Sequence, residues 1–158
     1  MTTAGGLAAL FSRDLTRLVQ ELLAFPSDKT LWERAPGVKN SAGSLVLHLE
    51  GNLREFVGRQ LGRVAYKRAR DQEFALNSLS REEMVHRMHE LKELIAKVMS
   101  ELSDNQLAAS YPEDVLGTTL SAHAFLVHLY GHLNFHLGQI DYLRRILTEG
   151  SAVTFAGL

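Results

Sequence analysis

Residues 128–140 read His128-Leu129-Tyr130-Gly131-His132-Leu133-Asn134-Phe135-His136-Leu137-Gly138-Gln139-Ile140. Three histidines recur here at every fourth residue, within a stretch whose apolar residues also follow a helical spacing. On a helix, residues four apart lie one above the other, with Cβ atoms roughly 5–6 Å apart. Two imidazoles in this relation can point at one cation. The rest of the chain can be understood as a scaffold that presents this face to another histidine, His48, far away in the sequence.

Apolar residues at intervals of three or four predict four long helices. These cover residues 7–25, a segment from about Ser41 to Gly62, residues 80–102, and a last helix from Thr118, Thr119 or Ser121 to about Glu149. Pro26 ends the first helix, and Gly150 is expected to end the last. No alternating pattern indicates a strand. Four amphipathic helices imply an all-α fold, a four-helix bundle that forms a single domain over residues 1–158.

The connection between the second and third helices, residues 62–79, is long for a bundle. A short link would make these two helices antiparallel neighbours, whereas a long crossover can leave them parallel. The crossover contains Arg68 and Arg70, followed by Asp71 and Glu73. The two arginines either hold a carboxylate of a substrate or form ion pairs that pin the crossover.

Composition narrows the classes of function. The 158 residues are 46% apolar and 22% charged, with a net charge of −1 and no cysteine. Without cysteine there is no disulfide, zinc–thiolate site, iron–sulfur cluster or thiol nucleophile, so any metal must be held by nitrogen and oxygen. Basic and acidic residues are interspersed, which is not typical of a nucleic-acid binder. No signal peptide or long apolar segment is recognisable, so we expect a cytoplasmic protein without a membrane partner.

The histidines predict a metal site. His132 and His136 lie on the inward face of the last helix, and His48 interrupts the apolar stripe of the second helix. Burying three imidazoles requires three sets of hydrogen-bond partners or one metal ion. Three neutral imidazoles with a free coordination position make a catalytic type of zinc site, and nickel(II) or iron(II) also accept nitrogen ligands. The alternative is a polar network in the core without metal.

Three further residues flank these histidines, each with two interpretations. His128 lies one turn before His132, so spacing does not exclude it as a fourth ligand that would close the site. Gln139 either holds a bound water or substrate oxygen, or is a surface amide. Asn52, one turn after His48, either orients a ligand histidine or is an amide at the edge of the core.

The motif His132-x-x-x-His136-x-Gly138-Gln139-Ile140 resembles the signature of the DinB-like (YfiT-like) metal-binding bundles. The segments 48–52 (His-Leu-Glu-Gly-Asn) and 68–74 (Arg-Ala-Arg-Asp-Gln-Glu-Phe) resemble a subgroup of unknown function. The resemblance spans nearly the whole chain. It implies an up-down-down-up bundle in which His48, His132 and His136 bind a divalent cation, often zinc or nickel. His128 does not match a ligand position of this family.

The resemblance also suggests a chemistry, because the superfamily contains thiol-dependent transferases and a maleylpyruvate isomerase that use low-molecular-weight thiols. One hypothesis is a metal-dependent enzyme, S-transferase-like or hydrolase-like, that activates a thiol or water for attack on a small-molecule substrate. Since the chain has no cysteine, the thiol must come from a cosubstrate. The other hypothesis is a non-catalytic, stress-related binding module in which the metal or the histidine cluster is structural. A third option is a metal-free protein that acts as a homodimer.

Overall fold

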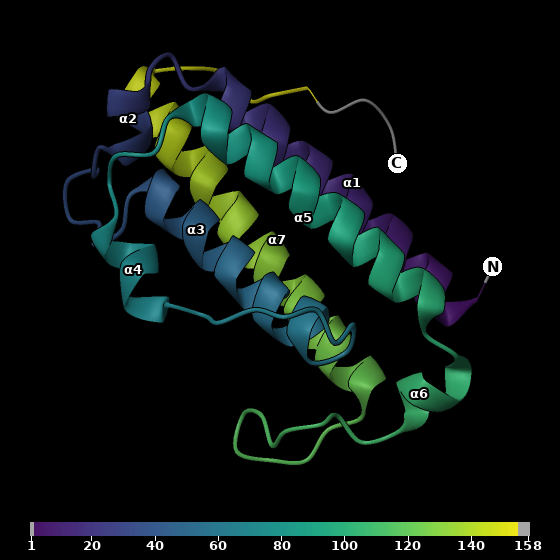
Figure 1. The fold of residues 1–158 in the computed structure, drawn as a ribbon. Coiled ribbons are helices and arrows are strands. Elements are labelled where there is room, and N and C mark those ends of the chain that lie inside the picture. The colour runs from purple at the N-terminus through teal and green to yellow at the C-terminus, as the bar shows by residue number, and fades with distance from the viewer. Residues whose placement is uncertain (1, 155–158) are drawn as a thin grey trace.

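The computed structural model describes residues 2–154 and shows a bundle of four long helices. These are α1 (Thr3–Ala24), α3 (Ala42–Leu53), α5 (Arg81–Glu101) and α7 (Ala122–Thr148). In Figure 1, α1 and α7 run in one direction and α3 and α5 in the other. The predicted all-α, up-down-down-up bundle is therefore confirmed, and residues 2–154 contain only isolated β-bridges in place of strands.

The crossover between α3 and α5 contains a short helix, α4 (Arg70–Ala75), which packs against α3. Figure 1 shows the chain leaving the far end of α3 and returning along it to the start of α5. This path makes α3 and α5 parallel, as the length of the segment predicts. It also brings the crossover residues alongside the helix that carries His48.

Several helix boundaries differ from the sequence prediction. Helix α1 begins at Thr3, not Leu7, because the Thr2 hydroxyl accepts a hydrogen bond from the amide of Gly5. Helix α7 ends at Glu149, which adopts the left-handed conformation with φ 51°, so Gly150 is not the terminating residue. Two connectors contain short helices, α2 (Asp28–Trp32) and α6 (Asp104–Ala108).

The second long helix is not α-helical throughout. The sequence predicts one helix to about Gly62, but α3 stops at Leu53 and continues as a π-helical segment, η1 (Arg54–Arg59). Here backbone amides bond to carbonyls five residues earlier, as from Gly62 to Val57 at 2.9 Å. Such segments are rare and are found frequently at functional sites. This one begins two residues after Asn52.

Helix α3 is the most deeply enclosed element of the described chain. All of its residues from Ala42 to Leu53 are buried, and it packs against α4, α5 and α7. Its polar residues His48, Glu50 and Asn52 therefore lie inside the bundle. Trp32 covers the start of α3, and its indole nitrogen donates to the carbonyl oxygen of Leu79 at 2.8 Å.

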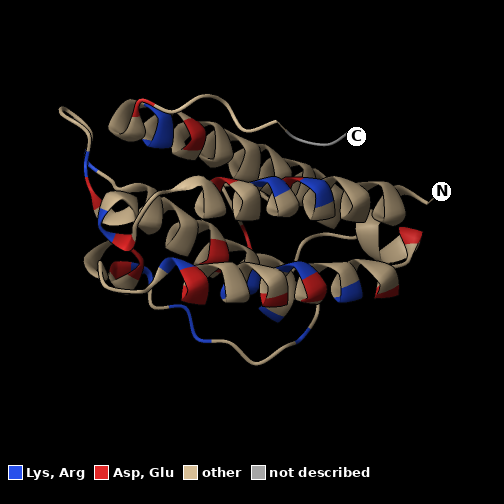
Figure 2. Ribbon diagram, turned by 90° about the horizontal axis from the view of Figure 1, so that it is seen from above, with Lys and Arg blue, Asp and Glu red and all other residues tan. Residues whose placement is uncertain are grey.

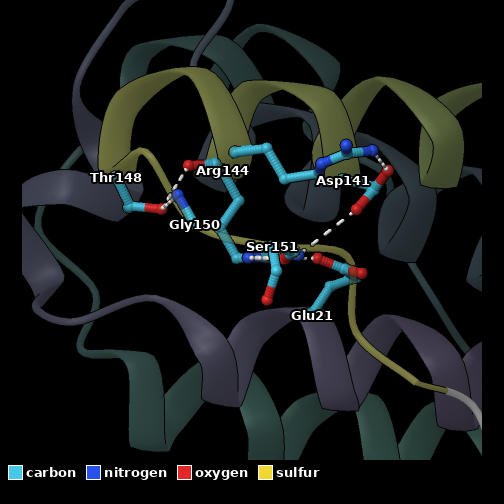
Figure 3. A network of polar contacts seen from close by, with 7 residues as sticks. Glu21, Asp141, Arg144, Thr148, Gly150 and Ser151 are labelled. Atoms are coloured by element: carbon cyan, nitrogen blue, oxygen red, sulfur yellow. Dashed lines mark hydrogen bonds and ion pairs between the residues drawn. The ribbon is translucent and has the colours of Figure 1, made fainter.

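On the outside of the bundle, basic and acidic residues are interspersed along the helices (Figure 2). Inside, a buried ion pair joins α1 to α7, with Arg144 Nε donating to Glu21 Oε2 at 2.6 Å (Figure 3). The same guanidinium donates to the carbonyl oxygen of Ser151, which fixes the segment after α7. Among the described residues, no helix combines the length and apolarity needed to cross a membrane.

Candidate metal centre

Three histidines from two distant segments converge inside the bundle. His48 on α3 and His132 and His136 on α7 each offer one ring nitrogen, and these nitrogens lie within 4.8 Å of one another. Nε2 of His132 is 3.3 Å from Nε2 of His48 and 3.1 Å from Nε2 of His136. The three rings are close to perpendicular in pairs, with centroids 4.5 to 5.2 Å apart.

These distances fit a divalent cation. Two nitrogens bound at about 2.0–2.1 Å to one tetrahedral zinc ion lie about 3.3 Å apart. The two measured Nε2–Nε2 distances are close to this value. A small movement of the imidazoles would therefore bring three nitrogen donors into bonding distance of one ion.

Glu73 orients the His48 ring from behind. Nδ1 of His48 donates to Oε2 of the buried Glu73 at 2.9 Å. Arg68 in turn holds both oxygens of this carboxylate, with Nε donating at 2.7 Å and Nη2 at 2.9 Å. The carboxylate approaches α3 directly over Gly51, where a Cβ atom would overlap it. A carboxylate behind a histidine fixes the ring orientation and raises the basicity of the other nitrogen.

Gln139 has the corresponding position behind His136. Nδ1 of His136 donates to Oε1 of Gln139 at 2.7 Å, one turn along α7. With the proton at Nδ1 in both His48 and His136, both Nε2 atoms present lone pairs to Nε2 of His132. A single N–H of His132 can satisfy only one of them, whereas a cation satisfies all three. Nδ1 of His132 is buried and has no hydrogen-bond partner among the described residues.

The electrostatics of the site favour neutral rings. Burial lowers the pKa of His132 to about 4, and the neighbouring His136 and His48 add to this effect. Burial also lowers the pKa of His48, against the opposing effect of Glu73. The pKa of His136 is lowered by burial as well, despite its hydrogen bond to Gln139. Neutral imidazoles are the form that binds a metal.

A cleft of about 540 Å³ opens beside the histidine cluster. Both His48 and His132 line it, so the predicted metal position can be reached from solvent. Its apolar wall comes from α7, η1 and the loop before α7 and consists of Phe56, Val115, Leu116, Phe125 and Leu129. Its polar lining consists of Asn52, Arg68, Arg70, Glu113, Asp114 and His128.

The other predicted site residues surround this arrangement in different roles. His128 is exposed, stacks on Phe125 with ring planes 8° apart, and is not part of the group that could hold an ion. Arg68 is occupied by Glu73, which agrees with the ion-pair interpretation. Asn52 is buried and makes no hydrogen bond to a histidine. Arg70 is exposed at the rim of the cleft.

Sequence reasoning missed two features of the site. Glu73 was considered only as an ion-pair partner for the arginines, yet it also accepts a hydrogen bond from His48. Phe74, whose ring centroid lies 5.2 Å from that of His48, was not considered as part of the site. The only available signal was their position in a crossover long enough to return along α3. The helical spacing that places His132 and His136 on the inward side of the last helix also predicts Phe135 there, but Phe135 is exposed to solvent, so this prediction is wrong.

Known structures share this fold. A DinB-like protein from Bacillus cereus is 19% identical, with a TM-score of 0.72 over 98% of this chain and 96% of that one. The DinB-like protein YjoA from Bacillus subtilis is 15% identical, with a TM-score of 0.70 over 95% of this chain and 96% of that one. A comparison with curated proteins gives no significant match. The sequence matches a family described as proteins of unknown function, DUF1572, over residues 10–156, and the chain therefore belongs to that family.

Proposed function

We propose that the protein binds a divalent cation through His48, His132 and His136 and acts as a metal-dependent enzyme on a small-molecule substrate. The observation that supports this most directly is the cleft that opens onto two of the three histidines. The set of three nitrogen donors without thiolate suits zinc or nickel, and also iron. A cation held in this way would supply a Lewis acid that lowers the pKa of a thiol or water.

The residues of the chain have separate tasks in this proposal. Glu73 keeps the proton of His48 on Nδ1, so that Nε2 faces the ion, and Gln139 does the same for His136. The aromatic and aliphatic wall of the cleft, with Phe56 and Phe125 in edge-to-face contact, limits access of water to a bound substrate. The thiol of an S-transferase-like reaction would be a low-molecular-weight cosubstrate, because the protein has none.

Metal binding is tested by titrating zinc and nickel into metal-free protein and measuring the stoichiometry by calorimetry. We expect one ion per chain, and loss of high-affinity binding in His48→Ala, His132→Ala and His136→Ala. The matched control is His123→Ala, which removes an exposed histidine of the same helix. Binding that is equally tight in wild type and His48→Ala would contradict the proposal.

Catalysis is tested separately on protein of known metal content. The metal-loaded protein is assayed with small thiols plus electrophiles, and with ester substrates for hydrolysis. We expect turnover that disappears on chelation and returns when the metal is restored. Turnover that survives complete removal of the metal would exclude a metal-dependent reaction.

A non-catalytic module is the second candidate, favoured by the fact that the three histidines join α3 to α7. In that case the ion would mainly fix the two helices against each other. The coordination number separates the two candidates, because a structural zinc is closed by four protein ligands and a catalytic zinc keeps an open position. X-ray absorption spectroscopy of the zinc-loaded protein gives the ligand set directly.

A further inference from the structure

We propose that the cleft beside the histidines binds a small organic acid whose carboxylate pairs with Arg70 and whose hydroxyl, amine or amide group donates a hydrogen bond to Asn52. The inference concerns the substrate class of the proposed enzyme, and only the role of this ligand as a substrate rests on that function. The binding itself requires no metal.

Asn52 lies in the wall of the cleft, and its side-chain oxygen has no hydrogen-bond partner among the described residues. Its side chain is only 8% exposed and lines the cavity, yet its Oδ1 atom is buried without any partner among the described residues. Buried side-chain polar atoms are nearly always hydrogen-bonded, and each exception calls for a physical explanation. Rotation of the amide about χ2 would turn this oxygen toward the cleft, where a donor group on a ligand, one turn from His48 along α3, would satisfy it.

The charges of the cleft leave one cation unpaired. Arg68 is engaged by both oxygens of Glu73. On the acidic side, Glu113 accepts from Arg59 at 3.1 Å, and Asp114 accepts from the Thr119 hydroxyl at 2.7 Å.

Arg70, the first residue of α4, lines the same cleft but forms no ion pair or hydrogen bond within residues 2–154. A planar guanidinium with five donors matches a carboxylate in a bidentate arrangement. The cleft therefore offers one anion-binding group at its rim and one acceptor deeper inside.

The size and lining of the cleft agree with a small ligand. Its volume of about 540 Å³ lies within the range of small-molecule sites. The apolar side chains of the lining can enclose a short carbon skeleton, and two of them, Leu129 and Phe125, are almost fully buried. Asn52 and Arg70 come from α3 and α4, which pack together, so their positions are fixed relative to each other.

The test uses three probes of nearly equal size on metal-free, ¹⁵N-labelled protein: L-lactate, propionate and L-lactamide. Lactate carries both the carboxylate and a donor, propionate lacks the donor, and lactamide lacks the charge. NMR titrations follow the side-chain amide of Asn52 and the backbone amides of α4. We expect lactate to bind about tenfold more tightly than lactamide, as loss of one charge-assisted hydrogen bond predicts. Propionate should be weaker than lactate.

Variants assign the two contacts. Arg70→Gln should weaken the binding of lactate and of propionate about tenfold. Arg70→Lys should recover only part of this loss, because it restores the charge but not the bidentate contact. Asn52→Leu should reduce the affinity for lactate to that for propionate. The control is Lys67→Gln, an exposed cation of the same crossover outside this cleft, which should leave every affinity unchanged. Equal binding of lactate and lactamide, or unchanged lactate binding in Arg70→Gln, would overturn the inference.

The outcome is independent of the metal proposal. Selective lactate binding in a protein that fails to bind zinc would support the cleft ligand and refute the metal centre. Zinc binding without selectivity for the carboxylate would support the metal centre and refute the cleft ligand.

Discussion

At the scale of single residues, Gly51 decides whether Glu73 can reach His48. A methyl group at position 51 would overlap the Glu73 carboxylate. We expect Gly51→Ala to displace this flexible carboxylate without unfolding α3. Since a partner behind a metal-binding histidine is typically worth 10–100-fold in metal affinity, zinc binding should weaken by about that factor. Competition with a chelator of known affinity measures the change.

Gly131→Ala is the control for that substitution. Gly131 lies in the middle of α7, and a Cβ atom there meets no other atom within 4 Å. Alanine should stabilise the helix by up to about 1 kcal/mol and leave zinc affinity unchanged. A Gly51→Ala protein that binds zinc as tightly as the Gly131→Ala protein would show that Glu73 does not support the site.

The three lowered histidine pKa values predict how the metal-free protein responds to acid. Burial keeps the rings neutral in the fold, and the pKa of His132 falls to about 4 from its ordinary value of 6.5. Between these two values the unfolded chain binds more protons than the folded chain, so stability is lost as the pH decreases through this window. Urea unfolding of metal-free protein between pH 7 and pH 4 measures this loss. In His132→Gln the free energy of unfolding should decrease less steeply with falling pH. The same pH dependence as in the wild type would show that His132 does not cause this loss of stability.

The sequence predicted the three histidines but only part of their surroundings. A four-residue spacing places His132 and His136 on one face regardless of tertiary structure, and a polar residue on an apolar stripe identified His48. The role of Glu73 depends on the path of the crossover, which no local pattern encodes. Phe135 directly precedes His136, so its side chain points about 100° away from that of His136 around the helix axis. In the structure this direction leads out of the bundle, and Phe135 is exposed to solvent.

At the scale of elements, one buried ion pair holds α1 against α7. The side chains of Glu21 and Arg144 are both almost completely buried (Figure 3). We expect Arg144→Met to destabilise the protein by about 3–5 kcal/mol, because it leaves the Glu21 carboxylate buried without its partner. The double variant Glu21→Leu/Arg144→Met should recover most of that loss. Chemical denaturation of both variants gives the comparison.

The neighbouring Arg145 provides the control for the buried pair. Its ion pair with Asp141 spans 3.5 Å and is partly exposed to solvent. Such pairs contribute about 0–1 kcal/mol, so Arg145→Met should have little effect. Equal destabilisation by Arg145→Met and Arg144→Met would contradict this account. The loss of stability would then come from removing positive charge at the end of α7, and not from breaking the buried ion pair.

The elements missed by sequence reasoning are too short or too irregular to show an apolar period. Helices α2 and α6 have five residues each, too few to show a periodic pattern or to be stable alone. Helix α6 instead depends on a capping box at Ser103 and Gln106. Residues 80–83 (Ser-Arg-Glu-Glu) have the sequence pattern of a capping box, which predicts two reciprocal hydrogen bonds at the start of α5. Ser80 accepts from the amide of Glu83, but the reciprocal bond is not formed within the described residues. The π-helical turn after Leu53 likewise leaves no mark in the apolar spacing.

At the scale of the whole molecule, the family resemblance implied the topology, and the length of one connection was consistent with it. The 62–79 segment is too long for a hairpin between helices, and the structure uses it to make α3 and α5 parallel. That arrangement places the crossover helix α4 against α3 and brings Arg68 and Arg70 to the cleft. The exposed face of α7 was harder to predict from the sequence, because it depends on how the four helices pack together.

The uncovered face of α7 leads to a prediction about self-association. Large apolar side chains stand along it, with Phe135 62%, Tyr142 64% and Ile146 59% exposed. Gly131 lies one turn before Phe135, and Gly138 lies between Phe135 and Tyr142; both glycines have open space at their Cβ positions. If a second copy packed antiparallel about a two-fold axis near residues 136 and 137, Tyr142 would lie opposite the partner's Gly131, and Phe135 opposite the partner's Gly138. Such an interface is self-complementary, with each ring above a glycine.

The size of this face predicts a weak dimer. Each aromatic side chain can bury about 150–250 Å², so the stripe and its flanks supply a few hundred Å² per copy, below the roughly 800 Å² of a standard interface. We therefore expect the mass from light scattering to rise from monomer towards dimer with increasing concentration. Tyr142→Glu should abolish this rise, because it places a charge against the partner helix. Leu23→Glu, at an equally exposed apolar position on α1, should not. A constant monomer mass over the whole concentration range would exclude both the interface and the option of a protein that acts by dimerising.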